Sequence, residues 1–211
     1  MIAGLKFGKD IRVAYISHLD VIRVFERALR RANLPLRFSQ GFSPKPKLVF
    51  AQALPLGITS SGEYLDIHLE EEIKPLKLLL KLAEIMPPGF DLYEVVALPE
   101  GIKPVMAVIT HASYLIYTSE PEIFLHAEKM KSLPYINKKG GKTKEVDLKP
   151  LIKSIELIDG GVRVVSQAGS KANLRPDALL CALGVKKPLR IHREDLYLER
   201  DGQLISPLKR N

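Results

Sequence analysis

The sequence predicts an α+β protein made of two tandem ferredoxin-like halves, each with the element order βαββαβ. The chain has 211 residues, enough for one large or two small domains, and its mean hydropathy of +0.01 is typical of a globular protein with a core. The patterns of residues 1–100 predict strand, helix, strand pair, helix and strand. Residues 101–211 show a similar order of elements without a residue-level repeat. We therefore expect domains at 1–100 and 104–211.

Charge is distributed unevenly along the chain. The formal net charge is +8 at pH 7, and residues 1–50, 51–100 and 101–211 have net charges of +7, −6 and +7. Such separation predicts one positive surface, which suits a polyanionic partner such as nucleic acid. A membrane surface is the competing partner. No stretch of about 18 apolar residues is present, so we expect no membrane association.

The first elements are two short apolar segments and a helix. Segments 3–7 and 11–15 are expected to form a strand or hairpin around a turn at 8–10. Ser17, followed three residues later by Asp20, is the pattern of a helix N-cap. Pro35 ends the helix, because the residue before a proline is disfavoured in helical conformation. Apolar residues at steps of three and four form one face of this helix: Leu19, Ile22, Phe25, Leu29 and Ala32. Four arginines form the other: Arg23, Arg27, Arg30 and Arg31.

The loop 39–47 follows this helix and is basic. It contains a glycine, two prolines, Phe42, Lys45 and Lys47. Backbone amides, hydroxyls, lysines and a phenylalanine beside an arginine-rich face suit phosphates and an unpaired base. We expect the basic residues of helix and loop to bind phosphates and Phe42 to stack on a base. The alternative is a solvated arginine face without a partner.

The rest of the first half is predicted from alternation and turn residues. Segments 36–38 and 47–53 are expected to be short strands. Residues 63–69 alternate between polar and apolar, which predicts a half-buried strand with Asp66 and His68 on its polar side. A second helix is expected from Lys74 or Pro75 to about Ile85, and a strand over 90–97 completes this half.

The second half contains another basic tract. Its patterns predict a strand at 105–117, a helix at 120–131, a strand pair at 135–146, a strand at 162–167, a helix at 175–183 and a strand at 189–198, with 147–157 ambiguous. Residues 129–153 hold eight lysines, and a glycine pair lies within the tract. A solvated loop is the alternative to binding here. Further candidates for nucleic-acid binding are Lys138, Lys139, Lys142, Arg190 and Arg193.

The sequence leaves enzymatic activity open. His18 and Asp20 are candidates for general acid–base catalysis, although capping explains Asp20 equally well. We find no CxxC, HExxH, GxSxG or phosphate-binding glycine loop. The single cysteine, Cys181, excludes an internal disulfide or a cysteine-ligated cluster, and the five histidines never have HxxxH spacing. We therefore expect no metal and no cofactor. Without a secretory signal, a cytoplasmic location is expected.

Several short runs, most of them in the first 70 residues, match a known family. They are residues 15–20, Arg23 with 25–31, 34–35, 38–39, 41–42 with Pro44, Pro46 and Lys47, 62–66, 146–148 with Pro150, 175–177 and 190–193. These runs resemble the bacterial radical-SAM-linked protein family of unknown function. Its members are small standalone proteins or a C-terminal domain joined to a cobalamin-binding radical SAM protein. At Lys45 the family more often has histidine, so no role of an imidazole is expected there.

The resemblance implies a partnership with radical SAM chemistry. The chain lacks the CxxxCxxC motif that would hold the cluster, so it is similar to the accessory part and not to the catalyst. Our main hypothesis is an RNA-binding accessory module that presents tRNA or rRNA to a separate radical SAM enzyme, with His18 adding a polar contact. The alternatives are an RNA-processing or RNA-modifying enzyme in its own right, and a scaffold that binds an acidic protein.

Overall fold

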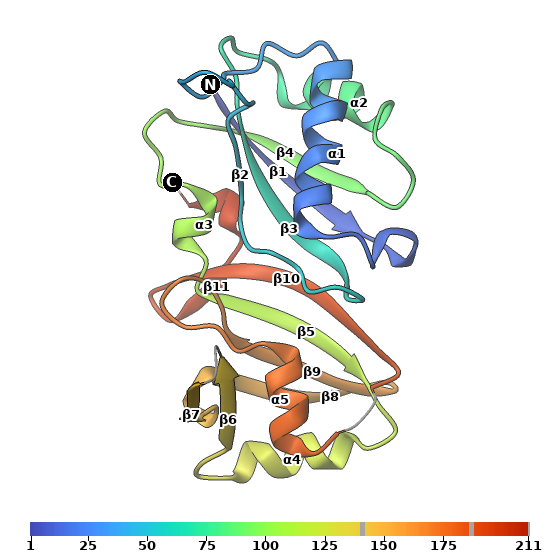
Figure 1. The fold of residues 1–211 in the computed structure, drawn as a ribbon, viewed down its shortest axis with the longest axis vertical. Helices are drawn as coiled ribbons and strands as arrows, with labels where there is room; N and C mark the ends of the chain where they lie inside the picture. Colours follow the sequence, from blue (N-terminus) through green and yellow to red (C-terminus); the bar gives the residue numbers. More distant parts are fainter. Residues whose placement is uncertain (140–141, 186–187, 211) are drawn as a thin grey trace.

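A computed structural model describes residues 1–139, 142–185 and 188–210 of the chain (Figure 1). The first half contains β1 (Ile2–Lys9), the short 3-10 helix η1 (Ile11–Val13), α1 (His18–Arg31), β2 (Leu48–Phe50), β3 (Thr59–His68), α2 (Pro75–Ala83) and β4 (Leu92–Leu98). Both helices of this half lie beside one sheet, and α1 crosses its front in Figure 1.

The second half has more elements. They are α3 (Val105–Val108), β5 (His111–Tyr117), α4 (Pro121–Lys129), β6 (Pro134–Lys139), β7 (Lys142–Asp147), η2 (Lys149–Leu151), β8 (Ile152–Ile158), β9 (Gly161–Gln167), α5 (Pro176–Leu183), β10 (Arg190–Arg200), β11 (Gln203–Ile205) and η3 (Pro207–Lys209). None of the helices in the described part of the chain is long and apolar enough to span a membrane.

One large sheet joins the two halves and makes the protein an α+β fold. In the described residues the strand order is β4-β1-β3-β10-β5-β9-β8, with β2 on β3 and β11 on β10, while β6 and β7 form a separate ribbon. Within each half the orders are β4-β1-β3-β2 and β10-β5-β9-β8, and all neighbours are antiparallel. This order is compatible with the two tandem ferredoxin-like halves, which stay a prediction.

The halves meet where β3 lies beside β10, and these two strands are parallel. Their register pairs Thr59 with His192 and Ser60 with Arg193. The backbones approach closely beyond these pairs, because a Cβ on Gly62 would lie 2.3 Å from the Cα of Asp195. We call this pairing the seam. It brings residues about 130 positions apart in sequence into one polar region.

Each half has its own hydrophobic core. In the first half, Leu5 and Phe7 of β1 pack with Phe25 and Leu29 of α1 and with Leu78 of α2. Buried residues of β5, β9, α4 and α5 form most of the other core, which also includes Ala51 and Tyr64 of the first half. The aromatic rings of Phe7 and Phe25 lie 4.6 Å apart, so the helix that carries the arginines is fixed directly on β1.

Several predicted elements differ from those observed. Segment 11–15 contains the helix η1 in place of a strand, and the predicted strand at 105–117 begins with the helix α3. Segment 36–38 forms isolated bridges, Leu36 to Leu69 and Phe38 to Pro46. Leu19 is 64% exposed, since it lies six residues before Phe25 and therefore about 120° around the helix from the buried face.

The prediction that strand 63–69 is half-buried is wrong, because both faces of β3 are covered. Asp66, on its polar face, is only 2% exposed. Its carboxylate accepts hydrogen bonds from the Val105 amide at 2.8 Å and from the Arg210 guanidinium at 2.6 Å. Residues from α3 and from the segment after η3 therefore cover this face and pair with the carboxylate. An alternating pattern indicates that the two faces of a strand differ in polarity. It does not indicate whether the polar face is exposed, and in β3 that face is covered.

Candidate functional site

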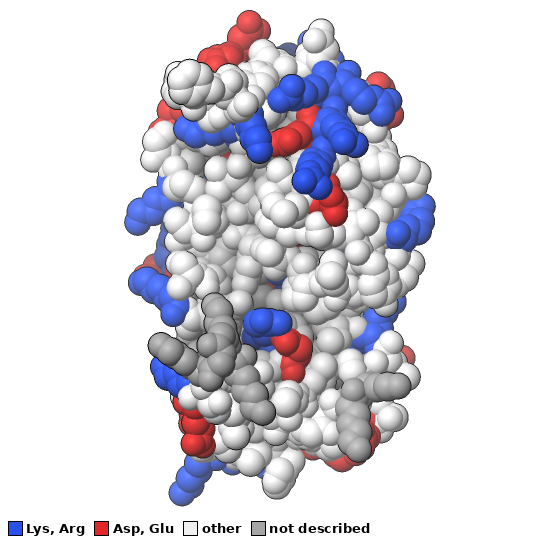
Figure 2. All heavy atoms as spheres, viewed as in Figure 1, with Lys and Arg blue, Asp and Glu red and all other residues white. Residues whose placement is uncertain are grey.

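The helix α1 presents its arginines to solvent as the sequence predicts. Its buried residues are Val21, Phe25, Ala28 and Leu29, and the helical repeat places all four arginines about 120–160° from Phe25. Figure 2 shows Lys and Arg gathered over α1 on the face viewed. The Ser17 hydroxyl accepts a hydrogen bond from the Asp20 amide at 3.2 Å, which caps the first turn. This surface is the product of a capped, amphipathic helix.

The arginines of α1 have few acidic partners. Arg23 forms an exposed ion pair with Asp20 at 2.9 Å, and the Arg30 guanidinium lies over the Phe38 ring, 5.5 Å from its centroid. Arg27 and Arg31 are exposed, and neither has an ion pair within the described residues. At least two cations on this face can therefore bind external anions without breaking an internal pair.

The loop after α1 folds back on itself and exposes an aromatic ring. The Ser39 amide donates to the Lys45 carbonyl at 2.8 Å, and the Lys45 amide donates to the Ser39 hydroxyl at 3.1 Å. Phe42 lies at the tip of this turn and is fully exposed, while Lys45 and Lys47 are exposed beside it. Gly41 precedes it with a φ of +124°, a conformation that L side chains rarely adopt. The predicted aromatic and basic residues thus lie on one compact loop.

The structure does not bring His18 and Asp20 together. Asp20 accepts from the Ser17 hydroxyl at 2.7 Å and from Arg23, and these contacts hold the pKa of Asp20 below its usual range. His18 is half-buried, its ring lies 5.5 Å from Phe50, and burial lowers its pKa. Residues two apart on a helix do not face each other. Asp20 is therefore a capping and pairing residue, and His18 belongs to a different environment.

His18 lines a small cavity beneath the first turn of α1. The cavity has a volume of about 10 Å³, close to the space for one water molecule. Its polar lining residues are Lys9, His18, Gln52 and Glu63. The Lys9 ammonium donates to the carbonyls of Ala14 and Ile16, and burial lowers its pKa. This arrangement places an amine, an imidazole and a carboxylate around one small space.

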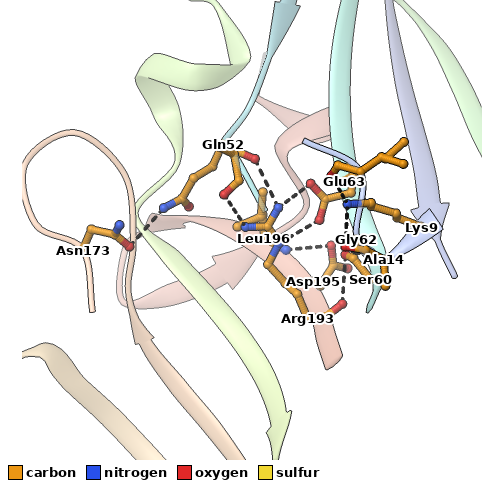
Figure 3. A network of polar contacts seen from close by, with 12 residues as sticks. Lys9, Ala14, Gln52, Ser60, Gly62, Glu63, Asn173, Arg193, Asp195 and Leu196 are labelled. Carbon is orange, nitrogen blue, oxygen red and sulfur yellow. Dashed lines mark hydrogen bonds and ion pairs between the residues drawn. The ribbon is translucent and has the colours of Figure 1, made fainter. Parts of the chain in front are cut away.

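A polar network at the seam includes Gln52 and Glu63, which also line this cavity (Figure 3). The guanidinium of Arg193 donates to both carboxylate oxygens of Glu63, through Nε at 2.8 Å and through Nη2. Arg193 also donates to the carbonyls of Gln52 and Ala53. Gln52 in turn donates to Asn173 at 3.0 Å, and its Oε1 is buried without a hydrogen-bond partner among the described residues. The network joins segments from both halves.

The prediction that Arg193 binds nucleic acid does not agree with its position. Its side chain is 0% exposed and paired with Glu63, so a phosphate would have to displace a buried carboxylate. Arg190 is exposed at the start of β10, with its guanidinium 4.8 Å from the centroid of the Tyr117 ring. No described contact joins Arg190 to α1. Lys138, Lys139 and Lys142 belong to β6 and β7, and their side chains lie outside the described residues.

Sequence reasoning missed Lys9, Gln52 and Glu63. Lys9 ends the apolar strand β1 and looked like a turn residue, whereas its ammonium points into the protein. Glu63 directly follows Gly62. A glycine inside a strand can mark a place where another backbone comes close, and this was the available signal that a second strand lies beside Glu63. Among the described residues, no group of three or more His, Cys, Asp or Glu side chains is placed to hold a metal ion.

Comparisons with known proteins give a family and distant similarities to solved structures. The model of a family described as "Uncharacterized protein conserved in bacteria (DUF2344)" matches residues 4–176. No curated protein matches the chain. A chain in the crystal structure of a Cbf5-Nop10-Gar1 complex is similar with a TM-score of 0.47 and 12% identity, covering 94% of this chain and 50% of that chain. The chain thus spans about half the length of this structural relative, and a similarity at this level supports no conclusion about function.

Proposed function

The chain belongs to the DUF2344 family of proteins conserved in bacteria, and from its surface we propose that it is an RNA-binding module. The observation that carries the proposal is the exposed basic face of α1 beside the loop with Phe42. Arg27 and Arg31 have no internal ion pair in the described part, and Lys45 and Lys47 are exposed nearby in sequence. Phosphate contacts supply most of the affinity for nucleic acid, and arginine and lysine make most of them.

The partner class follows from the resemblance of the chain to radical-SAM-linked proteins. In this proposal the protein holds a tRNA or rRNA in the cytoplasm while a separate radical SAM enzyme modifies it. The module supplies binding and orientation, and the enzyme supplies the cluster. Copurification of a radical SAM enzyme with the tagged protein is the expected result for the partnership. Its absence from a crosslinked complex that does contain RNA would limit the proposal to RNA binding.

Crosslinking tests the RNA proposal directly. Cells that express the tagged protein are irradiated with ultraviolet light, and the RNA bound to the purified protein is sequenced. We expect enrichment of a tRNA or rRNA region, and we expect the double variant Arg27→Ala, Lys47→Ala to lose it. The matched control is Lys171→Ala, Lys209→Ala, which removes two exposed charges that lie outside both basic tracts. Equal recovery of RNA with both double variants would contradict the proposal.

A second function is favoured by the cavity at His18. Lys9, His18 and Glu63 around one space are groups that can move protons, so an RNA-processing or RNA-modifying enzyme is the alternative. His18→Ala should then abolish turnover of the RNA that crosslinking identifies, while the protein keeps its affinity for that RNA. If the protein is an accessory module, neither the wild type nor this variant turns over RNA by itself. The variants at Arg27 and Lys47 weaken binding in both cases.

A further inference from the structure

We propose that α1 and the loops at its two ends form a track for single-stranded RNA, with an aromatic platform at each end. This inference rests on the proposed RNA-binding function and names the form of RNA that the surface suits. The track consists of Tyr15, Leu19, the four arginines of α1, Phe38 and Phe42. It differs from a general basic patch, because exposed apolar rings lie at both ends of the cationic stripe.

The first platform lies before the N-terminus of α1. Tyr15 is 76% exposed, and Leu19, one turn further, is 64% exposed. The Tyr15 side chain packs against Gly57. Three of its atoms lie 3.3–3.8 Å from the position that a Cβ on Gly57 would occupy. The Gly57 amide also donates to the Ala14 carbonyl at 2.9 Å, which ties the two loops together. The backbone of one loop thus supports an exposed ring on the other.

The second platform lies after the C-terminus of α1. Phe42 is fully exposed at the tip of its loop, and Phe38 packs under Arg30 in a cation–π contact. No described residue covers the Phe42 ring on both faces, since the side chain is as exposed as it is in an extended peptide. An exposed large ring costs solubility, and stacking on a base is one way to remove it from water.

The stripe between the platforms is cationic and of defined length. Leu19, Arg23, Arg27 and Arg30 lie on the outer side of α1, and the 14 residues of the helix span about 21 Å. A strand with stacked bases advances about 3.4 Å per nucleotide, so about six nucleotides would cover this length. That number lies within the range of about 4–16 nucleotides found for single-strand sites.

Single strands fit this surface better than duplexes or acidic proteins do. A duplex offers phosphates to the arginines, but its bases are paired and present no open face to Tyr15 and Phe42. An acidic protein would match the charge and leave the two supported rings without a flat partner. The aromatic rings therefore select single-stranded RNA over duplex RNA and over acidic proteins, whereas the arginines select only for negative charge.

The test measures the affinity of the purified full chain for a labelled 12-nucleotide oligouridylate and for a 12-base-pair RNA duplex by fluorescence anisotropy. We expect the single strand to bind more tightly. Tyr15→Ala, Phe42→Ala should weaken binding of the single strand by about five-fold or more per ring and leave the duplex unchanged. The control Ile136→Ala, Leu157→Ala removes two exposed apolar side chains of the second half and should change neither affinity.

A variant that removes charge separates RNA binding itself from the preference for a single strand. Arg27→Ala, Arg31→Ala should weaken both ligands and reduce the slope of log K against log salt by about 1.4 for the single strand. Duplex binding equal to single-strand binding, with no effect of the aromatic variant, would overturn the track and leave RNA binding in place. No binding of either RNA at low salt would overturn the RNA function itself, and an acidic protein would then be the partner to test.

Discussion

Arg193 and Glu63 show how much the role of a residue depends on partners far away in sequence. They lie 130 residues apart, yet they form a buried, doubly hydrogen-bonded ion pair at the seam. From sequence alone, Arg193 is one more cation in a basic chain and Glu63 is one acid in an alternating strand. The arginines of α1 could be predicted as a surface, because a helix repeat depends only on near neighbours. Pairing across strands has no such local rule.

Glu63→Gln should destabilise the protein strongly. The change leaves Arg193 buried without a countercharge, and breaking one partner of a buried pair typically costs about 3–5 kcal/mol. We expect a free energy of unfolding lower by about this amount in urea titrations. The control Asp177→Asn breaks the exposed pair with Arg175, which should have little effect. A Glu63→Gln protein as stable as the wild type would show that Arg193 finds another partner or water.

The cap of α1 gives a second prediction at this scale. Ser17→Ala removes the hydroxyl that accepts from the Asp20 amide, and such caps contribute about 1 kcal/mol. The urea midpoint should fall accordingly, whereas Ser17→Thr, which keeps a hydroxyl that can accept from the Asp20 amide and donate to the Asp20 carboxylate, should lose less. Equal losses in the two variants would mean that the hydroxyl makes its contribution elsewhere.

At the scale of elements, the helices with strong apolar periodicity and the strands at 90–97, 162–167 and 189–198 were predicted well, whereas the segment 11–15 was not. The helix from Ser17 to the proline turn was expected and is observed as α1, because capping, periodicity and Pro35 agree. The segment 11–15 is apolar enough for a strand, but the hydrogen bond from the Arg12 amide to the Asp10 carboxylate turns it into η1. Local side-chain contacts of this kind compete with extended structure.

Gly62 makes a prediction about the seam. A Cβ at this position would lie 2.3 Å from the Asp195 Cα and 2.7 Å from the Glu194 carbonyl oxygen, so β3 and β10 would have to separate. Gly62→Ala should therefore lower the free energy of unfolding by about 1–3 kcal/mol or more, as overpacking does. Urea titration measures the loss. A change within about 0.5 kcal/mol, the usual range for neutral surface substitutions, would mean that the strands part easily.

At the scale of the whole molecule, the α+β class was predictable and the single continuous sheet was not. Element order came from local patterns, and it gave two successive sets of strands and helices. The parallel contact between β3 and β10 depends on two backbones that meet only in the folded chain. The same limit applies to the candidate site: the basic helix and its loop were predicted, and the cavity at His18 was not, because β1, β2, β3 and α1 all contribute to it.

Four histidines that are buried or half-buried predict how stability depends on pH. Burial lowers the pKa of His18, His68, His111 and His192 in the folded protein, while the unfolded value is about 6.5. As the pH falls below about 6.5, the unfolded chain binds more protons than the folded chain, so the free energy of unfolding should fall. Urea midpoints between pH 7.5 and 5.5 measure this slope. Replacing His192 by Gln should reduce it, and a flat profile would contradict the assignment.

The position of β10 in the sheet has a consequence for how the protein is made. A ribosome completes β3 at residue 68 but completes β10 only at residue 200. At about 5–20 residues per second, the interval is about 7–26 s. During that time β3 can pair with β1, but its other edge, at Thr59 and Ser60, lacks the strand that it pairs with in the folded protein. Chaperones that shield strand edges would act most usefully in this window, before the last tenth of the chain emerges.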